Sequence, residues 1–207
     1  DNCNEIRELK DEADRKVKTQ ETYHLDWKID MSYSEKLLFK GYEYIRPEPA
    51  EGRRSRGYYD HESLWTDTIA YYTRYDPVLT VKKPWAYIIP QAWSDVVDKL
   101  CHNGVKAFRL ASDTELEVET YYIENAEPSG RANQGHHINQ NVEVRLKKQT
   151  LPYYKGDYVI VTNQRANRYI VKMLEPQAPS SYFVWNFFDP ILESGDFYSV
   201  RTFESQL

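Results

Sequence analysis

The chain has 207 residues, of which 41% are hydrophobic and 29% charged, with a net charge of −5. This length can bury a substantial core, and so small a charge disfavours nucleic acid or an anionic membrane as partner. The two cysteines, Cys3 and Cys101, are too few for a disulfide framework, and no stretch approaches the roughly 20 apolar residues of a membrane span. The chain starts at Asp1, without an initiator methionine or a signal peptide. We therefore expect a processed product or a fragment of something longer.

The first third of the chain alternates helical and extended patterns. Apolar residues recur at helical spacing among many charges over residues 4–18, which predicts a helix with a narrow apolar stripe, typical of a linker. A strand pattern follows over 37–44. Residues 47–63 are expected to form a long surface loop because Pro47 and Pro49 cannot continue a sheet. Two short strands, 69–75 and 78–82, are predicted next.

The clearest architectural signal lies at about residues 85–110. A short apolar strand over 86–89 precedes a helix over 91–103, which ends at Gly104, and a second strand over 105–110. This succession predicts a βαβ unit with parallel strands and a right-handed crossover. Its first turn contains no glycine, so no backbone cradle for phosphate is indicated.

The remainder of the chain predicts more strands and two helices. Alternating apolar and charged residues over 116–122 and 142–146 indicate two strands whose opposite charges favour antiparallel pairing. A strand over 158–161 precedes a helix that Asn163 would cap, and a final short helix would begin at Ser180 or Ser181. We therefore predict an α+β fold: a mixed β-sheet with the βαβ unit, antiparallel strands, and helices packed mainly on one face. Residues 1–20 would be a helical linker and 21–207 a single domain.

Signatures of catalysis and metal binding fail on inspection. None of the five histidines is followed three residues later by a carboxylate, so the His-x-x-Glu pair of many zinc sites is missing. Asp60, His61 and Glu62 are suitable ligand types, but neighbours on an extended chain point to opposite sides. Cys101 beside His102 is better interpreted as a buried, inert thiol. We assign no catalytic residue and no metal ligand.

One polar segment remains as a candidate ligand site. Its residues are Asn163, Gln164, Arg165, Asn167 and Arg168, with Trp185 and Asn186 further along the chain. If they converge, the amides could bind a backbone-like ligand, an arginine could hold a carboxylate and the indole could form an apolar floor, which would suit peptides or sugars. We favour the structural alternative, in which Asn163 caps a helix, the arginines pair with Glu175 or Asp189, and Trp185 fills the core.

Several motifs suggest a family. They are HLDW at 24–27, FKGYE at 39–43, WAYIIPQAW at 85–93, NGV at 103–105, EVETYYIE at 117–124, KGDYVIVTNQRANRYIV at 155–171, LEPQAPSSYF at 174–183 and WNFFD at 185–189. Over most of its length the chain resembles the region downstream of the catalytic domain in zinc carboxypeptidases of the carboxypeptidase A type from Bacteroidetes.

This resemblance implies a non-catalytic C-terminal accessory domain that packs on or positions the peptidase domain of the same polypeptide. It also implies a periplasmic, cell-surface or secreted protein, with zinc only in the parent catalytic domain and no cofactor in this chain. It carries no catalytic residue across. Two alternatives stay open: a peptide- or glycan-binding module that uses the 163–168 segment and aromatic residues, and part of an active metallocarboxypeptidase.

Overall fold

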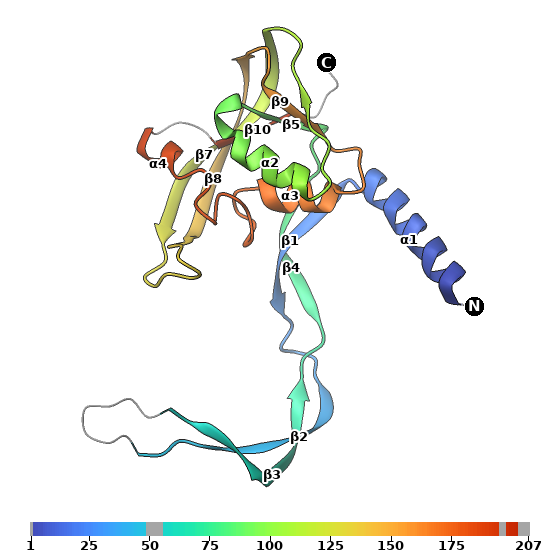
Figure 1. The fold of residues 1–207 in the computed structure, drawn as a ribbon, viewed down its shortest axis with the longest axis vertical. Helices are drawn as coiled ribbons and strands as arrows, with labels where there is room; N and C mark the ends of the chain where they lie inside the picture. Colours follow the sequence, from blue (N-terminus) through green and yellow to red (C-terminus); the bar gives the residue numbers. More distant parts are fainter. Residues whose placement is uncertain (1, 49–55, 195–197, 203–207) are drawn as a thin grey trace. The chain divides into compact units, whose positions relative to one another are not determined.

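The computed structural model describes residues 2–48, 56–194 and 198–202 (Figure 1). The chain consists of two compact units, one made of Asp1–Asp26 with Val78–Leu207 and the other of Trp27–Pro77. The division into a linker and a single domain stays a prediction. Among the described residues, no helix combines the length and apolar character needed to cross a membrane.

An antiparallel sheet forms the centre of the larger unit. In the described part of the chain it has six strands in the order β6-β9-β5-β10-β7-β8, and each neighbouring pair is antiparallel. The strands are β5 (Ala86–Ile89), β6 (Phe108–Arg109), β7 (Thr114–Pro128), β8 (Asn139–Tyr153), β9 (Tyr158–Val161) and β10 (Tyr198–Thr202).

The predicted βαβ unit and mixed sheet are wrong. Strands β5 and β6 flank helix α2 (Ser94–His102) in the chain, but β9 lies between them and pairs antiparallel with both. Because β9 comes from about residue 160, the pattern around 85–110 contains no sign of it. The α+β fold with helices mainly on one face is also wrong, since strand residues predominate and α1 (Asn2–Thr19) buries no side chain.

Alternate side chains of β5 and β9 enter two different cores. Tyr87 and Ile160 point into the main cluster, together with residues of α2 and of α3 (Asn167–Leu174). Ile88 and Val159 enter the second cluster with Leu116 and others from β7. All four residues of β5 are buried. A strand covered on both sides is continuously apolar, which explains the AYII sequence.

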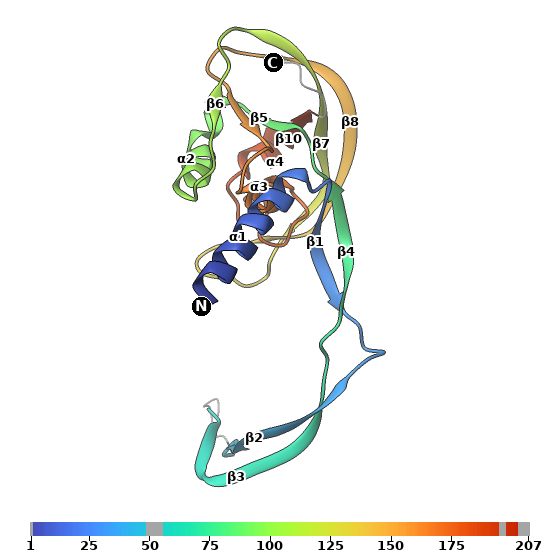
Figure 2. The same ribbon diagram turned by 90° about the vertical axis from the view of Figure 1, so that its right-hand side faces the viewer.

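Strands β7 and β8 form the long hairpin that the charge pattern predicted, and Figure 2 shows them side by side along their length. Glu117 pairs with Lys148 at 2.7 Å and Glu124 with Arg145 at 2.9 Å. These contacts confirm the antiparallel pairing of the two strands. Their side chains are exposed, so each ion pair adds at most about 1 kcal/mol of stability.

The helix boundaries match the sequence in some places and not in others. Helix α1 confirms the predicted 4–18 helix, and a 3-10 turn, η1 (Gln91–Trp93), leads into α2. Gly104 has φ of 82°, as expected for the residue that ends α2. Helix α3 begins at Asn167, four positions after the predicted cap, with Ala166 as its N-cap residue. The helix expected after Ser181 is a series of turns, followed by the short α4 (Pro190–Ser194).

The smaller unit is a two-stranded antiparallel ribbon of β2 (Glu35–Ile45) and β3 (Tyr58–Tyr71). None of its described residues is buried. The unit boundary falls within β1 (Thr22–Ile29) and β4 (Tyr75–Lys82), which pair with each other. The predicted loop over 47–63 is wrong for 58–63, which belong to β3, and its residues 49–55 lie outside the described part of the chain.

Candidate functional site

The two central amides of the predicted polar segment serve the fold. Asn167 is fully buried, and its Nδ2 donates to the carbonyls of Thr162 at 2.9 Å and Val17 at 3.2 Å. Its Oδ1 accepts a hydrogen bond from the backbone N–H of Gln164 at 3.0 Å. The amide therefore connects the end of β9, the start of α3 and the last turns of α1. No sequence motif marks a residue 150 positions away as the partner.

Gln164 joins two chain segments in the same manner. Its Oε1 accepts from the backbone N–H of Lys106 at 2.8 Å, and its Nε2 donates to the Lys106 carbonyl at 3.1 Å. Nε2 also donates to the carbonyl of Val161 at 2.9 Å. The side chain thus extends the pairing of the sheet beyond β9, using both amide atoms that a ligand would need.

The other three members of the segment are exposed. Arg165 lies 3.4 Å from Asp14 of α1, an exposed ion pair, and not against Glu175 or Asp189. Asn163 lines a cavity of about 360 Å³. Arg168 is exposed on α3. The cavity beside Asn163 is lined by Lys18, Lys82, Lys83, Pro84, Trp85, Val161, Thr162 and Asn163.

Trp185 and Asn186 contact a different part of the larger unit. The Trp185 ring meets His136 edge-on, with centroids 5.8 Å apart. Asn186 has φ of 69°, and its Nδ2 donates to the carbonyl of His137 at 3.1 Å and to Asp189 at 3.0 Å. These contacts are with His136, His137 and Asp189, whereas Gln164 and Asn167 form hydrogen bonds elsewhere, with Lys106, Val161, Thr162 and Val17. A ligand role for the seven residues stays a prediction, but their geometry favours packing.

A buried carboxylate, not foreseen from the sequence, lies at the centre of the main core. Glu175 is only 1% exposed, and the hydroxyl of Tyr87 donates to its Oε1 at 2.6 Å. The hydroxyl of Tyr121 donates to Oε2. These three residues come from α3's end, β5 and β7, so the interaction connects the helix layer to two strands of the sheet. The cluster therefore holds the helix layer and the sheet together through buried hydrogen bonds.

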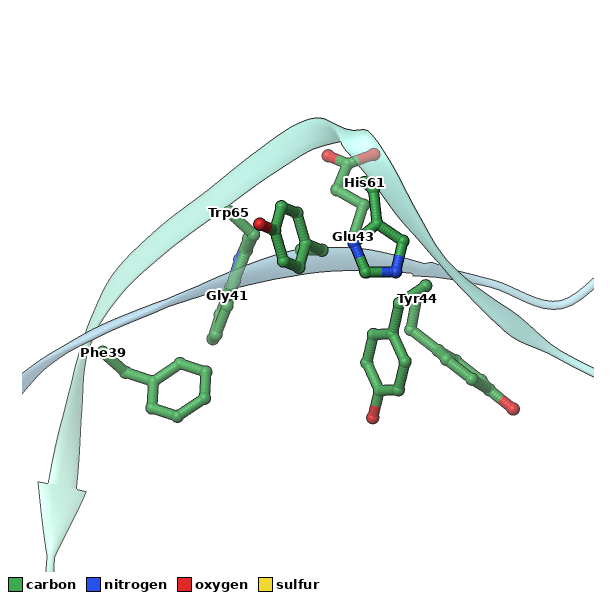
Figure 3. A pocket seen from close by; sticks show the side chains of 8 residues that line it. Phe39, Gly41, Glu43, Tyr44, His61 and Trp65 are labelled. Carbon is green, nitrogen blue, oxygen red and sulfur yellow. The ribbon is translucent and has the colours of Figure 1, made fainter.

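A concave surface lies on the β2–β3 ribbon (Figure 3). We call it the aromatic cavity. It encloses about 690 Å³ and is lined by Phe39, Gly41, Tyr42, Glu43, Tyr44, Tyr59, His61 and Trp65. The FKGYE motif at 39–43 lies in this lining, whereas Tyr59 and His61 fall within the segment predicted to be a loop.

Three pairs of rings follow one another along the cavity. Ring centroids are 5.7 Å apart for Phe39 with Trp65, 4.6 Å for Tyr42 with His61, and 5.1 Å for Tyr44 with Tyr59. Such tilted pairs are mutually attractive and exclude water from their contact edges. Because each pair spans both strands, the rings also stabilise the ribbon.

The Asp60, His61 and Glu62 triplet is organised locally. The carboxylate of Asp60 accepts from the Ser63 hydroxyl at 2.7 Å and the Glu62 N–H at 3.0 Å. The Ser63 hydrogen bond, followed by that of the Glu62 N–H, lowers the pKa of Asp60. Within residues 2–48, 56–194 and 198–202, no group of three His, Cys, Asp or Glu side chains is placed to hold a metal ion.

Cys101 is exposed, so the predicted burial of its thiol is wrong.

Comparisons with known proteins give a partial similarity. The chain is 31% identical over 107 residues to carboxypeptidase 2 of Trichophyton rubrum, covering 52% of this chain and 20% of that protein. It is 30% identical over 105 residues to carboxypeptidase 2 of Trichophyton tonsurans, covering 51% and 19%. No family model and no solved structure matches. The chain thus spans about a fifth of the length of these curated relatives and is similar to fungal carboxypeptidases over about half of its own length.

Proposed function

We propose that this chain is a non-catalytic accessory part of a larger carboxypeptidase-related protein, in which it packs on or positions a peptidase domain of the same polypeptide. The observation that carries the proposal is the partial similarity: half of this chain corresponds to about a fifth of fungal proteins named carboxypeptidase 2. A segment shared with much longer enzymes is what an accessory part would look like.

The use of the polar side chains supports this proposal. Two buried polar residues, Asn167 and Glu175, connect helices to the sheet through their hydrogen bonds. The sequence lacks a His-x-x-Glu pair. We therefore assign zinc and the catalytic groups to the peptidase domain. From the resemblance we also propose a C-terminal position for this chain and a periplasmic, cell-surface or secreted location for the parent. The parent itself we propose to be a Bacteroidetes zinc carboxypeptidase.

The test compares the parent protein with a version that lacks these 207 residues. The truncated enzyme should keep its zinc but have a lower Tm and a lower kcat/KM for peptides with a free C-terminus. Adding the purified 207-residue chain should restore part of the loss, whereas an equal concentration of serum albumin should not. Identical Tm and kcat/KM with and without the segment would refute the accessory role.

A second measurement separates the accessory role from an active enzyme. The isolated chain should contain no stoichiometric zinc by elemental analysis and should release no C-terminal residue from peptides. One zinc per chain together with such cleavage would show that the chain is itself a metallocarboxypeptidase.

The second candidate is a peptide- or glycan-binding module. The aromatic cavity favours it, because an open aromatic surface with few charges is typical of such sites. The 163–168 segment, where the sequence placed that role, has its two central amides occupied by backbone groups.

A further inference from the structure

The aromatic cavity is built by an irregularity in strand pairing. Tyr42 lies opposite Leu64, but the next residue, Glu43, lies opposite Asp60. The extra residues on β3 bend the ribbon, as Figure 2 shows, because a bulge lengthens only one of the two strands. One of them, His61, is thereby placed against the ring of Tyr42, between the Phe39–Trp65 pair and the Tyr44–Tyr59 pair.

Two glycines let the rings lie on the backbone. A Cβ added at Gly41 would stand 2.8 Å from Cε1 of Phe39, and one at Gly57 would overlap the ring of Tyr44. The absent side chains therefore leave room that these rings fill. Figure 3 shows the rings of Phe39 and Tyr44 on the same side of the two strands. A surface whose rings are already held in place loses little conformational entropy when a ligand binds.

The polar groups of the cavity are mainly hydrogen-bond donors. Among the described residues, no hydrogen bond engages the hydroxyls of Tyr42, Tyr44 and Tyr59 or the indole N–H of Trp65. An indole N–H only donates, and a phenol readily donates. Among the described residues of the lining, Glu43 is the one carboxylate, and none carries an amide, lysine or arginine side chain. The cavity thus offers apolar faces with several donors at their edges.

We propose that the aromatic cavity binds a proline-rich peptide segment in the polyproline II conformation. Such a segment exposes unpaired backbone carbonyls, lacks N–H groups at its prolines and is preformed, so it matches a lining of rings and donors. A volume of about 690 Å³ accommodates a few residues. A sugar chain fits less well, because its hydroxyls both donate and accept and are best paired by amides and several carboxylates. The inference does not depend on the accessory role proposed above.

The experiment uses the complete 207-residue chain and a decaproline peptide, with binding followed by isothermal titration and tryptophan fluorescence. Trp65→Ala and Tyr44→Ala should each weaken binding at least about tenfold, the loss expected when an aromatic anchor is truncated. Tyr71→Ala is the matched control: Tyr71 and Tyr44 are both 51% exposed, but Tyr71 lies outside the cavity. It should bind like the unmodified chain.

A conservative variant keeps the rings while removing donors. Tyr44→Phe with Tyr59→Phe should weaken decaproline binding several-fold without changing the far-ultraviolet circular dichroism of the ribbon. The proposal is overturned if decaproline does not bind at millimolar concentration, if the cavity variants bind like Tyr71→Ala, or if a neutral oligosaccharide such as chitohexaose binds at this cavity and decaproline does not.

Discussion

Replacing Tyr87 by Phe tests whether the buried Glu175 cluster stabilises the larger unit. Tyr87 and Glu175 are each 1% exposed, so water cannot replace the lost hydroxyl, and Oε1 of Glu175 would lose a 2.6 Å hydrogen bond. Loss of such a buried hydrogen bond to a carboxyl oxygen costs about 1 to 3 kcal/mol. With a urea m-value of about 2 kcal/mol per molar, a loss of about 2 kcal/mol lowers the unfolding midpoint by about 1 M.

The assay is a urea titration followed by circular dichroism, with Tyr154→Phe as the control. Tyr154 is 60% exposed, so its variant should change the free energy of unfolding by less than about 0.5 kcal/mol. Tyr121→Phe should resemble Tyr87→Phe, and the double variant should be non-additive because both hydroxyls bind one carboxylate. If Tyr87→Phe unfolds at the same midpoint as Tyr154→Phe, the proposed contribution of the cluster is wrong.

Three further changes test other parts of the fold. Asn167→Ala should lower the free energy of unfolding by about 1 to 3 kcal/mol, because the Thr162 and Val17 carbonyls and the Gln164 N–H lose their partner; an unchanged melting temperature would contradict this. Gly104→Ala should cost about 1 kcal/mol through its φ of 82° alone, since an added Cβ meets nothing within 4 Å, and Gly130→Ala, equally open, should cost close to nothing in the same melts. Burial, assisted by the charge of Asp157, raises the pKa of Tyr153 above its usual value of 10. The protonated form is favoured in the folded chain, so the stability that this group contributes is complete below pH 10 and is lost as the pH rises above it. Tyr153→Phe should therefore reduce the fall in melting temperature between pH 9 and 11. An unchanged dependence of melting temperature on pH would count against the reasoning.

The sequence could predict those elements whose signals are local. The apolar residues at helical spacing over 4–18 predicted a helix, and α1 is that helix. The AYII strand, the helix that ends before Gly104, and the opposite charges on β7 and β8 all have causes within a few residues of each element. In each case a side-chain period or a backbone requirement acts over one or two turns or one strand, so neighbouring letters contain the information.

The sheet order and the site could not be predicted this way. The order β6-β9-β5 depends on β9 pairing between two strands that precede it by many residues. This pairing uses backbone N–H and C=O groups, which are the same for nearly every residue type and so cannot be recognised in the sequence. Asn163 is a residue type that caps helices, but it is the side chain of Asn167 that accepts the hydrogen bond from the Gln164 N–H. The same side chain also donates to the Val17 carbonyl of α1. The seven predicted ligand residues divide between two neighbourhoods for the same reason: the partners of Gln164 and Asn186 come from distant segments.

By itself the sequence determined the N-terminal helix, several of the strands and a resemblance to carboxypeptidases, which the comparisons support for about half of the chain. Only the tertiary structure decided that Glu175 is a core residue and that the rings from Phe39 to Trp65 share one cavity. The physical reason is the range of the interactions. Periodicity and capping act between neighbours in the chain, whereas a buried acceptor or an aromatic cavity exists only when residues tens of positions apart are brought together.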